Sequence, residues 1–254
     1  RRQRQLCIRD SFVYDLTQTP TANNFGNFTY TNMDEFKASS FGADTIPAFV
    51  NYVEGIYVGH KFYETAAAEG LIDYDKTVVY PFGRGLSYTT FTQTLNSVTE
   101  ADGTITVDVT VTNTGSASGK EVVEVYYNPP YTNGGIEKAS ANLIGFAKTS
   151  ELAPGASENV TVTFKAEDMA SYDTYGKGCY VLEKGDYVIS INADSHTVLD
   201  SKTYTVASDI VYDASNKRES DVEVADNKFD FAEGNVTYLS RANGFANYAE
   251  ATAC

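Results

Sequence analysis

The chain has 254 residues, of which 42% are hydrophobic and 13% aromatic, a composition typical of a folded globular protein rather than a disordered one. Its formal net charge of −15 excludes the broad basic surface that binding to nucleic acid requires. No apolar run approaches the roughly 18 residues that a membrane-spanning helix needs. We therefore expect neither nucleic acid nor a membrane among its partners.

Residues 1–84 are predicted to be the C-terminal part of an α/β domain. The clearest element is a helix over 60–70, with alanines in its interior and Gly70 where a left-handed C-terminal cap is expected. Apolar stretches at 54–59 and 76–83 flank this helix, and we expect a short strand and a further extended segment there. These elements are too few to cover both faces of a sheet, so the domain is expected to be incomplete.

Residues 85–206 are predicted to form an antiparallel β-sandwich. Residues 104–113 (TITVDVTVTN) alternate apolar and polar side chains, the pattern of a half-buried strand. About seven such strands, with turn signals and no helical period between them, favour a fold of the immunoglobulin or fibronectin III type. The chain has no tryptophan for the Cys-Trp-Cys signature of antibody domains, which favours the fibronectin-like variety. The other expected strands are 121–128, 158–166, 185–192 and 201–208.

Residues 207–254 lose this periodicity. The stretch is acidic and polar up to about residue 234 and ends in VTYLSRANGFANYAEATAC. Such a composition predicts a polar connector that leads into another part of a protein.

The stretch VVYPFGRGLSYTTF (78–91) contains a Gly-x-Gly turn that could belong to a phosphate site. A dinucleotide fingerprint needs a third glycine where Tyr88 stands, and a helix rather than a strand after it. A nucleophile elbow would need a glycine two residues after the serine, which is also absent. We therefore predict that Gly83 and Gly85 turn the backbone where two domains join, with Arg84 paired to a carboxylate across the seam.

Cysteine and histidine positions predict neither a disulfide framework nor a metal site. Cys7, Cys179 and Cys254 are far apart and include no Cys-x-x-Cys pair, and His60 and His196 lack the spacing of metal ligands. We expect no metal and no organic cofactor.

Two longer stretches resemble glycoside hydrolase family 3, the β-glucosidase family. Residues 52–91, with YVEGIYVGHKFYETAAAEG followed by VVYPFGRGLSYTTF, resemble the segment that closes the α/β sandwich domain of that family. Residues 119–164 are similar to its fibronectin III-like domain. The motif NVTYLSRANGF (235–245) is similar to members with permuted order, in which both domains precede the (β/α)8 barrel. The resemblance covers about 45–206.

The resemblance implies retaining hydrolysis, with an aspartate nucleophile on the barrel and a glutamate acid/base on the α/β domain. Neither the nucleophile nor the acid/base can be matched to a position in this chain, so we expect no catalytic residue here. The implied role is a non-catalytic portion of a β-glucosidase-like enzyme that buttresses the catalytic domains. The loops 128–142 and 172–180, rich in Tyr, Gly and Asn, are candidates to border the sugar.

Four residues are candidates for contacts with substrate: Glu54, His60, Lys61 and Arg84. His60 and Arg84 stand where the resembling family usually has or often has tyrosine, which points to altered leaving-group specificity. Glu54 is a candidate for the catalytic acid, but we interpret it instead as a structural or pocket-edge carboxylate paired with Lys61.

The expected partners are a β-linked oligosaccharide or an aryl or alkyl glycoside, bound through the full-length enzyme, and the enzyme's own catalytic domains. The alternative is a stand-alone β-sandwich for carbohydrate binding or adhesion. The stretch 52–91 discriminates between them, because a free module has no use for a long seam motif. A seam without its partner should also expose apolar side chains.

Overall fold

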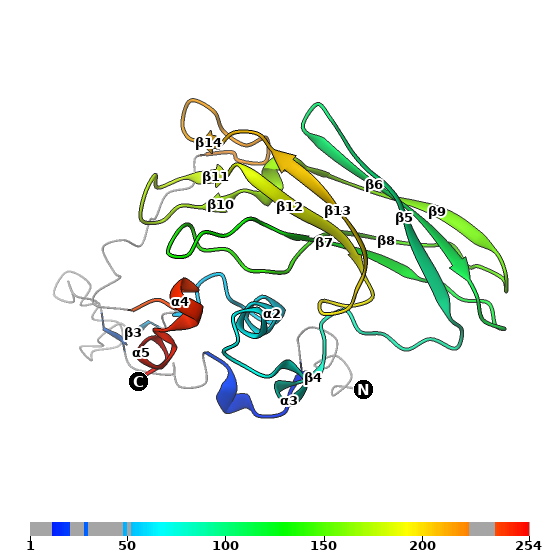
Figure 1. Ribbon diagram of the computed structural model, residues 1–254, viewed down its shortest axis with the longest axis horizontal. Helices are drawn as coiled ribbons and strands as arrows, with labels where there is room; N and C mark the ends of the chain where they lie inside the picture. Colours follow the sequence, from blue (N-terminus) through cyan, green and yellow to red (C-terminus); the bar gives the residue numbers. More distant parts are fainter. Residues whose placement is uncertain (1–11, 21–27, 30–47, 50–51, 224–236, 254) are drawn as a thin grey trace, which may run out of the picture.

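The computed structural model describes residues 12–20, 28–29, 48–49, 52–223 and 237–253, and two antiparallel sheets dominate it (Figure 1). One sheet has the order β5 (Phe91–Ala101), β6 (Thr104–Asn113), β9 (Ser157–Lys165). The other has the order β13 (Val198–Val206), β12 (Gly185–Asn192), β7 (Val122–Asn128), β8 (Asn142–Lys148). The predicted β-sandwich is confirmed.

The core of the sandwich follows directly from the strand patterns. In β6, Ile105, Val107, Val109 and Val111 are fully buried, while the threonines and aspartate between them point to the other face. The apolar side chains of β7, β9 and β12 meet them in one hydrophobic cluster. Alternation over ten residues therefore decides which face of β6 packs into the core, while its pairing with β5 and β9 places it at the centre of its sheet.

The turn between β5 and β6 is set by two residues. Asp102 and Gly103 have φ values of 49° and 72°, as the tight turns that suit the twist of a hairpin require. The register then pairs Ala101 with Thr104.

Strand β8 was not predicted from the sequence. Its Gly145 lies opposite Val125, next to an irregularity in the pairing of β7 with β8. A Cβ at Gly145 would lie 2.8 Å from Cγ1 of Val162 in the facing sheet, so the position needs glycine for close packing. The glycine breaks the alternation by which a strand is recognised.

A small sheet extends one end of the sandwich. Its order is β10 (Ser171–Tyr172), β11 (Tyr180–Leu182), β14 (Ile210–Tyr212), and β10 and β11 hold the loop 173–179 between them. This sheet positions one wall of the pocket described below.

Helical segments gather on one side of the sandwich (Figure 1). They are α2 (His60–Ala68), α3 (Tyr74–Thr77), α4 (Ala242–Phe245), α5 (Tyr248–Ala251) and the 3-10 turn η1 (Leu16–Gln18). Short strands accompany them: β1 (Phe12–Val13) pairs with β4 (Val78–Tyr80), and β2 (Phe28–Thr29) pairs with β3 (Ala48–Phe49). The 3-10 turn η3 (Ala166–Met169) instead follows β9, and Ala166 and Met169 belong to the core of the sandwich.

The predicted helix is confirmed as α2. Gly70 follows it with φ of 75°, and the amide of Leu71 donates to the carbonyl of Ala66 over 2.8 Å, which closes the helix end. The strand expected at 54–59 is wrong. Gly55 and Gly59 have φ of 54° and 58°, and these left-handed residues turn the chain twice instead of extending it.

A second hydrophobic cluster joins α2 to the C-terminal segment. Phe245 packs edge-on against Tyr57 with ring centroids 4.9 Å apart, and the amide of Leu239 donates to the carbonyl of Val53 over 2.7 Å. Ala139, from the loop that leads into β8, belongs to the same cluster. Residues 237–253 therefore pack against both α2 and the sandwich, a contact that no periodicity in the sequence indicates.

Candidate functional site

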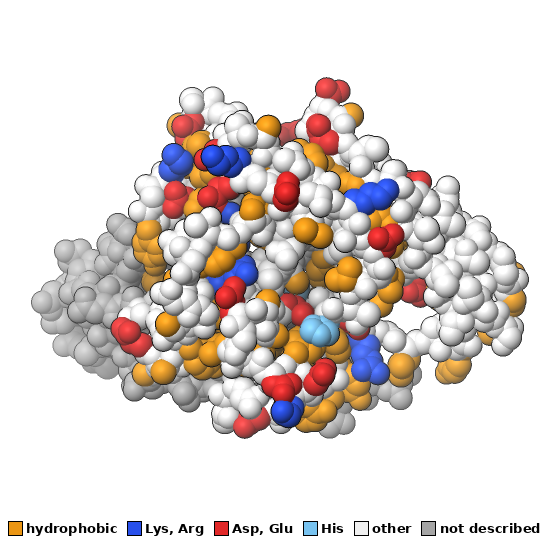
Figure 2. Space-filling model, in the orientation of Figure 1, with side chains coloured by type: hydrophobic (Ala, Val, Ile, Leu, Met, Phe, Trp, Pro, Cys, Tyr) orange, Lys and Arg blue, Asp and Glu red, His pale blue; other side chains and the backbone are white. Residues whose placement is uncertain are grey.

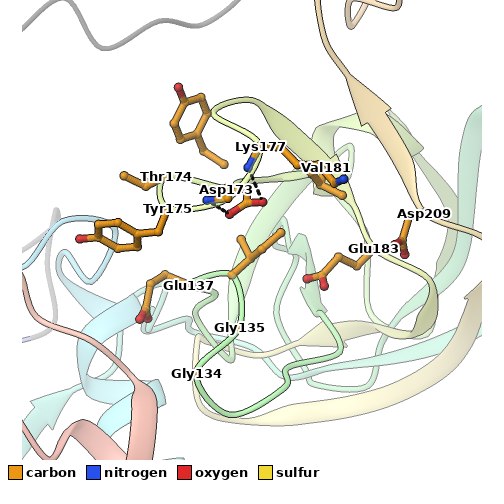
Figure 3. A pocket seen from close by; sticks show the side chains of 13 residues that line it. Gly134, Gly135, Glu137, Asp173, Thr174, Tyr175, Lys177, Val181, Glu183 and Asp209 are labelled. Carbon is orange, nitrogen blue, oxygen red and sulfur yellow. Dashed lines mark hydrogen bonds between the residues drawn. The ribbon is translucent and has the colours of Figure 1, made fainter. Parts of the chain in front are cut away.

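Two loops and the start of β14 enclose a pocket of about 390 Å³ at one end of the sandwich, here called the loop pocket (Figure 3). This volume lies within the range of roughly 300–1,000 Å³ found for small-molecule sites. Tyr175 and Glu137 lie on one side of it, and Glu183 and Asp209 on the other. The lining residues are Gly134, Gly135, Ile136, Glu137, Tyr172, Asp173, Thr174, Tyr175, Gly176, Lys177, Val181, Glu183 and Asp209.

The loop 173–179 is held by Asp173. Its Oδ1 accepts from the amide of Gly176 over 2.9 Å and its Oδ2 from the amide of Lys177 over 2.8 Å. Gly178, with φ of 64°, lets the loop return, and its amide donates to the Asp173 carbonyl. These bonds fix the loop and leave Tyr175 83% exposed at the mouth of the pocket.

The floor of the pocket is tied to the sheet by a buried lysine. Lys138 forms an ion pair with Glu183 and donates to the carbonyl of Pro130 over 2.7 Å. Its side chain is almost fully buried, so the pairing with a carboxylate and a carbonyl offsets the cost of removing the ammonium from water. Tyr187 adds a bond from its hydroxyl to the Glu183 carbonyl over 3.1 Å.

The opposite wall is anchored by Glu137. Its carboxylate accepts from the hydroxyl of Tyr57, the hydroxyl of Ser240 and the amide of Arg241. Glu137, which lines the loop pocket, is therefore held in place by the segment before α2 and by the C-terminal segment.

Chemically, the loop pocket offers hydrogen-bond acceptors beside an aromatic face. A carboxylate has about four acceptor sites, and Asp173 uses two of them within its loop. Sugar hydroxyls can donate to the remaining sites, and the exposed ring of Tyr175 suits the apolar face of a pyranose. Within the described ranges, no three His, Cys, Asp or Glu side chains are grouped in a way that could hold a metal ion. No helix in these ranges is both long and apolar enough to cross a membrane.

Of the four sequence-predicted site residues, Glu54 lies in the turns before α2 and Lys61 lies within α2, and neither lines the loop pocket. Glu54 is buried, its Oε2 has no hydrogen-bond partner, and burial raises its pKa. Burial lowers the pKa of Lys61. No ion pair between Glu54 and Lys61 is found in the described part of the chain, although the sequence suggested one.

His60 and Arg84 lie at the seam between α2 and the sandwich. The His60 ring stacks on Phe82 at 4.6 Å and meets Tyr126 edge-on at 6.1 Å. Burial, and then the nearby charge of Lys61, lower the pKa of His60 to about 4, so the ring is neutral at pH 7. Arg84 is exposed and lies 5.1 Å from the ring of Tyr80.

The positions of Gly83 and Gly85 differ in whether they tolerate a side chain, and alanine substitutions test this difference. Gly83 has φ of 87°, and a Cβ there would lie less than 3.0 Å from carboxylate atoms of Glu124. Gly83→Ala is expected to lower the free energy of unfolding by about 1–3 kcal/mol, through backbone strain and the displaced carboxylate. Gly85→Ala meets no atom within 4 Å and is the matched control, expected to change stability by less than about 0.5 kcal/mol.

Urea denaturation followed by circular dichroism measures both variants. Equal effects at Gly83 and Gly85 would contradict the structural role of the first glycine.

A buried carboxylate that sequence reasoning missed joins α2 to the turn between β12 and β13. Oε1 of Glu64 accepts from the hydroxyls of Tyr74 (2.6 Å) and Ser195 (2.8 Å), and its Oε2 lies 2.8 Å from Nδ1 of His196. The rings of Tyr74 and His196 stack at 3.7 Å. Glu64 and His196 are too distant in sequence for any local pattern to pair them.

Comparisons with known proteins agree with this geometry. A fibronectin type III-like domain model matches residues 121–195, which span β7 to β12. β-Glucosidase A of Butyrivibrio fibrisolvens is 39% identical over 189 residues, covering 66% of this chain and 22% of that protein. A β-glucosidase of Ruminococcus albus is 32% identical over 205 residues, covering 79% and 19%.

Solved structures give the same result. The β-glucosidase of Paenibacillus barengoltzii superposes with a TM-score of 0.64 at 32% identity, covering 80% of this chain and 20% of that one. The GH3 β-glucosidase of Bifidobacterium adolescentis has a TM-score of 0.52 at 31% identity, covering 62% and 22%.

This chain is a glycoside hydrolase family 3 β-glucosidase-like segment with a fibronectin III-like domain. The β-glucosidase-like segment spans about a fifth of the length of the curated relatives it matches. The match to the fibronectin III-like domain includes all residues that line the loop pocket except Asp209, and the C-terminal segment holds Glu137 from behind.

Proposed function

We propose that the chain is the non-catalytic portion of a retaining β-glucosidase-like hydrolase and that it buttresses the catalytic domains. In this proposal, residues 1–84 are the end of an α/β domain, 85–206 the fibronectin III-like domain, and 207–254 the connector toward a barrel. The substrate of the whole enzyme is a β-linked oligosaccharide or an aryl or alkyl glycoside. The similarity to β-glucosidases over a fifth of their length supports this assignment.

The observation that carries the proposal is the exposure of large apolar side chains along the seam. Leu86 is 95% and Tyr88 101% exposed in the segment that links β4 to β5. Soluble proteins seldom leave such side chains without a partner in a structured link, so the seam is suited to contact a further domain. Tyr52, Ile56 and Val58, in the turns before α2, add to the exposed apolar surface.

The loop pocket is the part of the segment proposed to border the bound sugar. Its walls are the two loops that the sequence marks as rich in Tyr, Gly and Asn. The carboxylates there are already held by protein donors, as preorganised recognition of hydroxyls requires. Glu54, His60, Lys61 and Arg84 are proposed as residues of the domain seam that act on the sugar site only through the packing of α2.

The experiment is a graft of this chain into β-glucosidase A of Butyrivibrio fibrisolvens, in place of the matching stretch. We expect hydrolysis of 4-nitrophenyl β-D-glucoside by the graft with kcat/KM within about tenfold of the parent, a difference of about 1.4 kcal/mol in the barrier. The 254-residue chain alone is expected to give no hydrolysis above background. A folded but inactive graft, or an active free chain, would contradict the proposal.

The second candidate function is a free-standing carbohydrate-binding or adhesion module. The exposed ring of Tyr175 favours it, because such rings are common in sugar-binding surfaces. Sedimentation of the free chain with insoluble polysaccharide distinguishes the two functions. Strong sedimentation of the chain with the polysaccharide, lost in Tyr175→Ala, would favour the free-standing module. The module does not explain the exposed apolar side chains of the seam.

A further inference from the structure

A groove of about 550 Å³ lies between α2 and the outer face of the β13-β12-β7-β8 sheet, and it shares no residue with the loop pocket. Figure 2 shows this side of the molecule, where the surface between the sandwich and the helices is hollowed and mostly uncharged or apolar. The lining residues are Glu64, Ala67, Ala68, Tyr126, Tyr127, Asn128, Ser140, Ala141, Val188, Ser190, Asn192, Ser195, His196, Val198 and Ser201.

The strand register explains why polar side chains gather in this groove. Ser190 of β12 pairs with Tyr126 of β7 on one side and with Ser201 of β13 on the other. Asn192 follows two residues later on the same face. The intervening Ile189 and Ile191 point into the core, so the sheet presents hydroxyl and amide groups outward under α2.

The Asn192 side chain lines the groove, is buried, and lacks a hydrogen-bond partner for one of its polar atoms. It is only 2% exposed, and its Oδ1 has no hydrogen-bond partner. A buried acceptor without a donor costs about 1–3 kcal/mol, and such groups are rare in folded proteins. Asn192 lines the groove, and a turn of its amide toward the groove would let a ligand that donates a hydrogen bond satisfy this acceptor.

His196 supplies a second acceptor. Its Nδ1 lies 2.8 Å from Glu64 Oε2, and a carboxylate can only accept, so Nδ1 carries the proton in the neutral ring. Nε2 is then left as an acceptor, and the ring that carries it is fixed by stacking on Tyr74 at 3.7 Å. Glu64 itself is occupied by three donors from the protein.

We propose that this groove binds a neutral, pyranose-sized sugar, at a site separate from the loop pocket. Sugar hydroxyls donate to Asn192 Oδ1 and His196 Nε2, while Ser190 and Ser201 offer hydroxyls that can donate or accept. Ala67, Ala68 and Val198 supply apolar surface for the C–H face of the ring. The proposal does not depend on the catalytic role of a larger enzyme, since it concerns binding by this chain itself.

The test is saturation-transfer NMR of D-glucose with the 254-residue chain, followed by titration for affinity. We expect saturable binding, and Asn192→Leu is expected to weaken it by about fivefold or more, as for the loss of one buried hydrogen bond. The same variant should melt at the same temperature or higher, because it removes an unsatisfied acceptor. Ser190→Ala, a smaller change on the same strand, provides a second variant should Asn192→Leu fail to fold, and it is also expected to weaken binding.

Two controls define the site. Tyr175→Ala alters the loop pocket and is expected to leave the groove's affinity for glucose unchanged. Thr163→Ala changes an exposed residue of β9, in the other sheet, and should have no effect. Absence of saturable binding overturns the proposal, as does binding that Asn192→Leu and Ser190→Ala leave unchanged or binding that Tyr175→Ala removes. Tighter saturable binding of ethylammonium than of glucose would also overturn it, because a cation site would then explain the free acceptors.

Discussion

Glu64→Leu is expected to lower the free energy of unfolding by about 3 kcal/mol, because it leaves two buried hydroxyls without an acceptor and removes the partner of an exposed histidine. The hydroxyls of Tyr74 and Ser195 and the Nδ1–H of His196 all depend on this carboxylate. Since Ser195 and His196 belong to the β12–β13 turn and Tyr74 to α3, the loss should loosen α2 and α3 from the sandwich. Urea denaturation monitored by tyrosine fluorescence measures the change.

Two variants control this prediction. Glu64→Gln keeps one acceptor oxygen, and we expect it to cost about 1 kcal/mol. Glu151→Gln changes an exposed carboxylate and should lie within about 0.5 kcal/mol of the unaltered chain. If Glu64→Leu proved as harmless as the exposed control, the carboxylate would not be the tie between α2 and the sandwich.

Arg241→Met is expected to lower stability by about 2–4 kcal/mol and to release the C-terminal segment first. Nε of Arg241 donates to Glu69 Oε1 over 2.6 Å, its Nη1 donates to the carbonyl of Lys138 over 2.9 Å, and its guanidinium lies 4.1 Å from the ring of Tyr131. One buried side chain thus connects the end of α2 with the loop that leads into β8.

Hydrogen exchange is the measurement suited to Arg241, because it resolves local from global opening. Amides of 239–252 should exchange much faster in Arg241→Met, while those of β6 in the sandwich core keep their protection. Arg241→Lys retains the charge but loses the planar guanidinium. The exchange rates of 239–252 in this variant should lie between those of the unaltered chain and those of Arg241→Met. Uniform loss of protection in both regions would show that the segment does not open on its own.

The sandwich could be predicted because its strands carry their pattern locally. β6 repeats apolar and polar residues without interruption, and α2 ends at a glycine of the expected kind. The stretch 54–59 misled the prediction, since an apolar run between two glycines fits a strand equally well until the φ values of Gly55 and Gly59 are known. Sequence pattern reports burial, and it does not report a left-handed backbone.

The candidate sites were harder to predict from the sequence than the sandwich. The loops of the loop pocket could be marked by composition, but the position of Glu137 depends on its bonds with the C-terminal segment, which has no periodic signal. The groove depends on Glu64 pairing with His196 and on an unsatisfied Asn192. Both are consequences of tertiary packing between segments that are distant along the chain.

We propose that this segment supports a β-glucosidase without taking part in its chemistry. The most direct test compares the Butyrivibrio fibrisolvens graft with and without Glu64→Leu, measuring kcat/KM at 25 °C and the temperature of half-inactivation. We expect kcat/KM to be unchanged within about twofold and the half-inactivation temperature to be lower by about 5 °C or more. A large fall in kcat/KM with an unchanged inactivation temperature would contradict it, because Glu64 would then serve the reaction and not the scaffold.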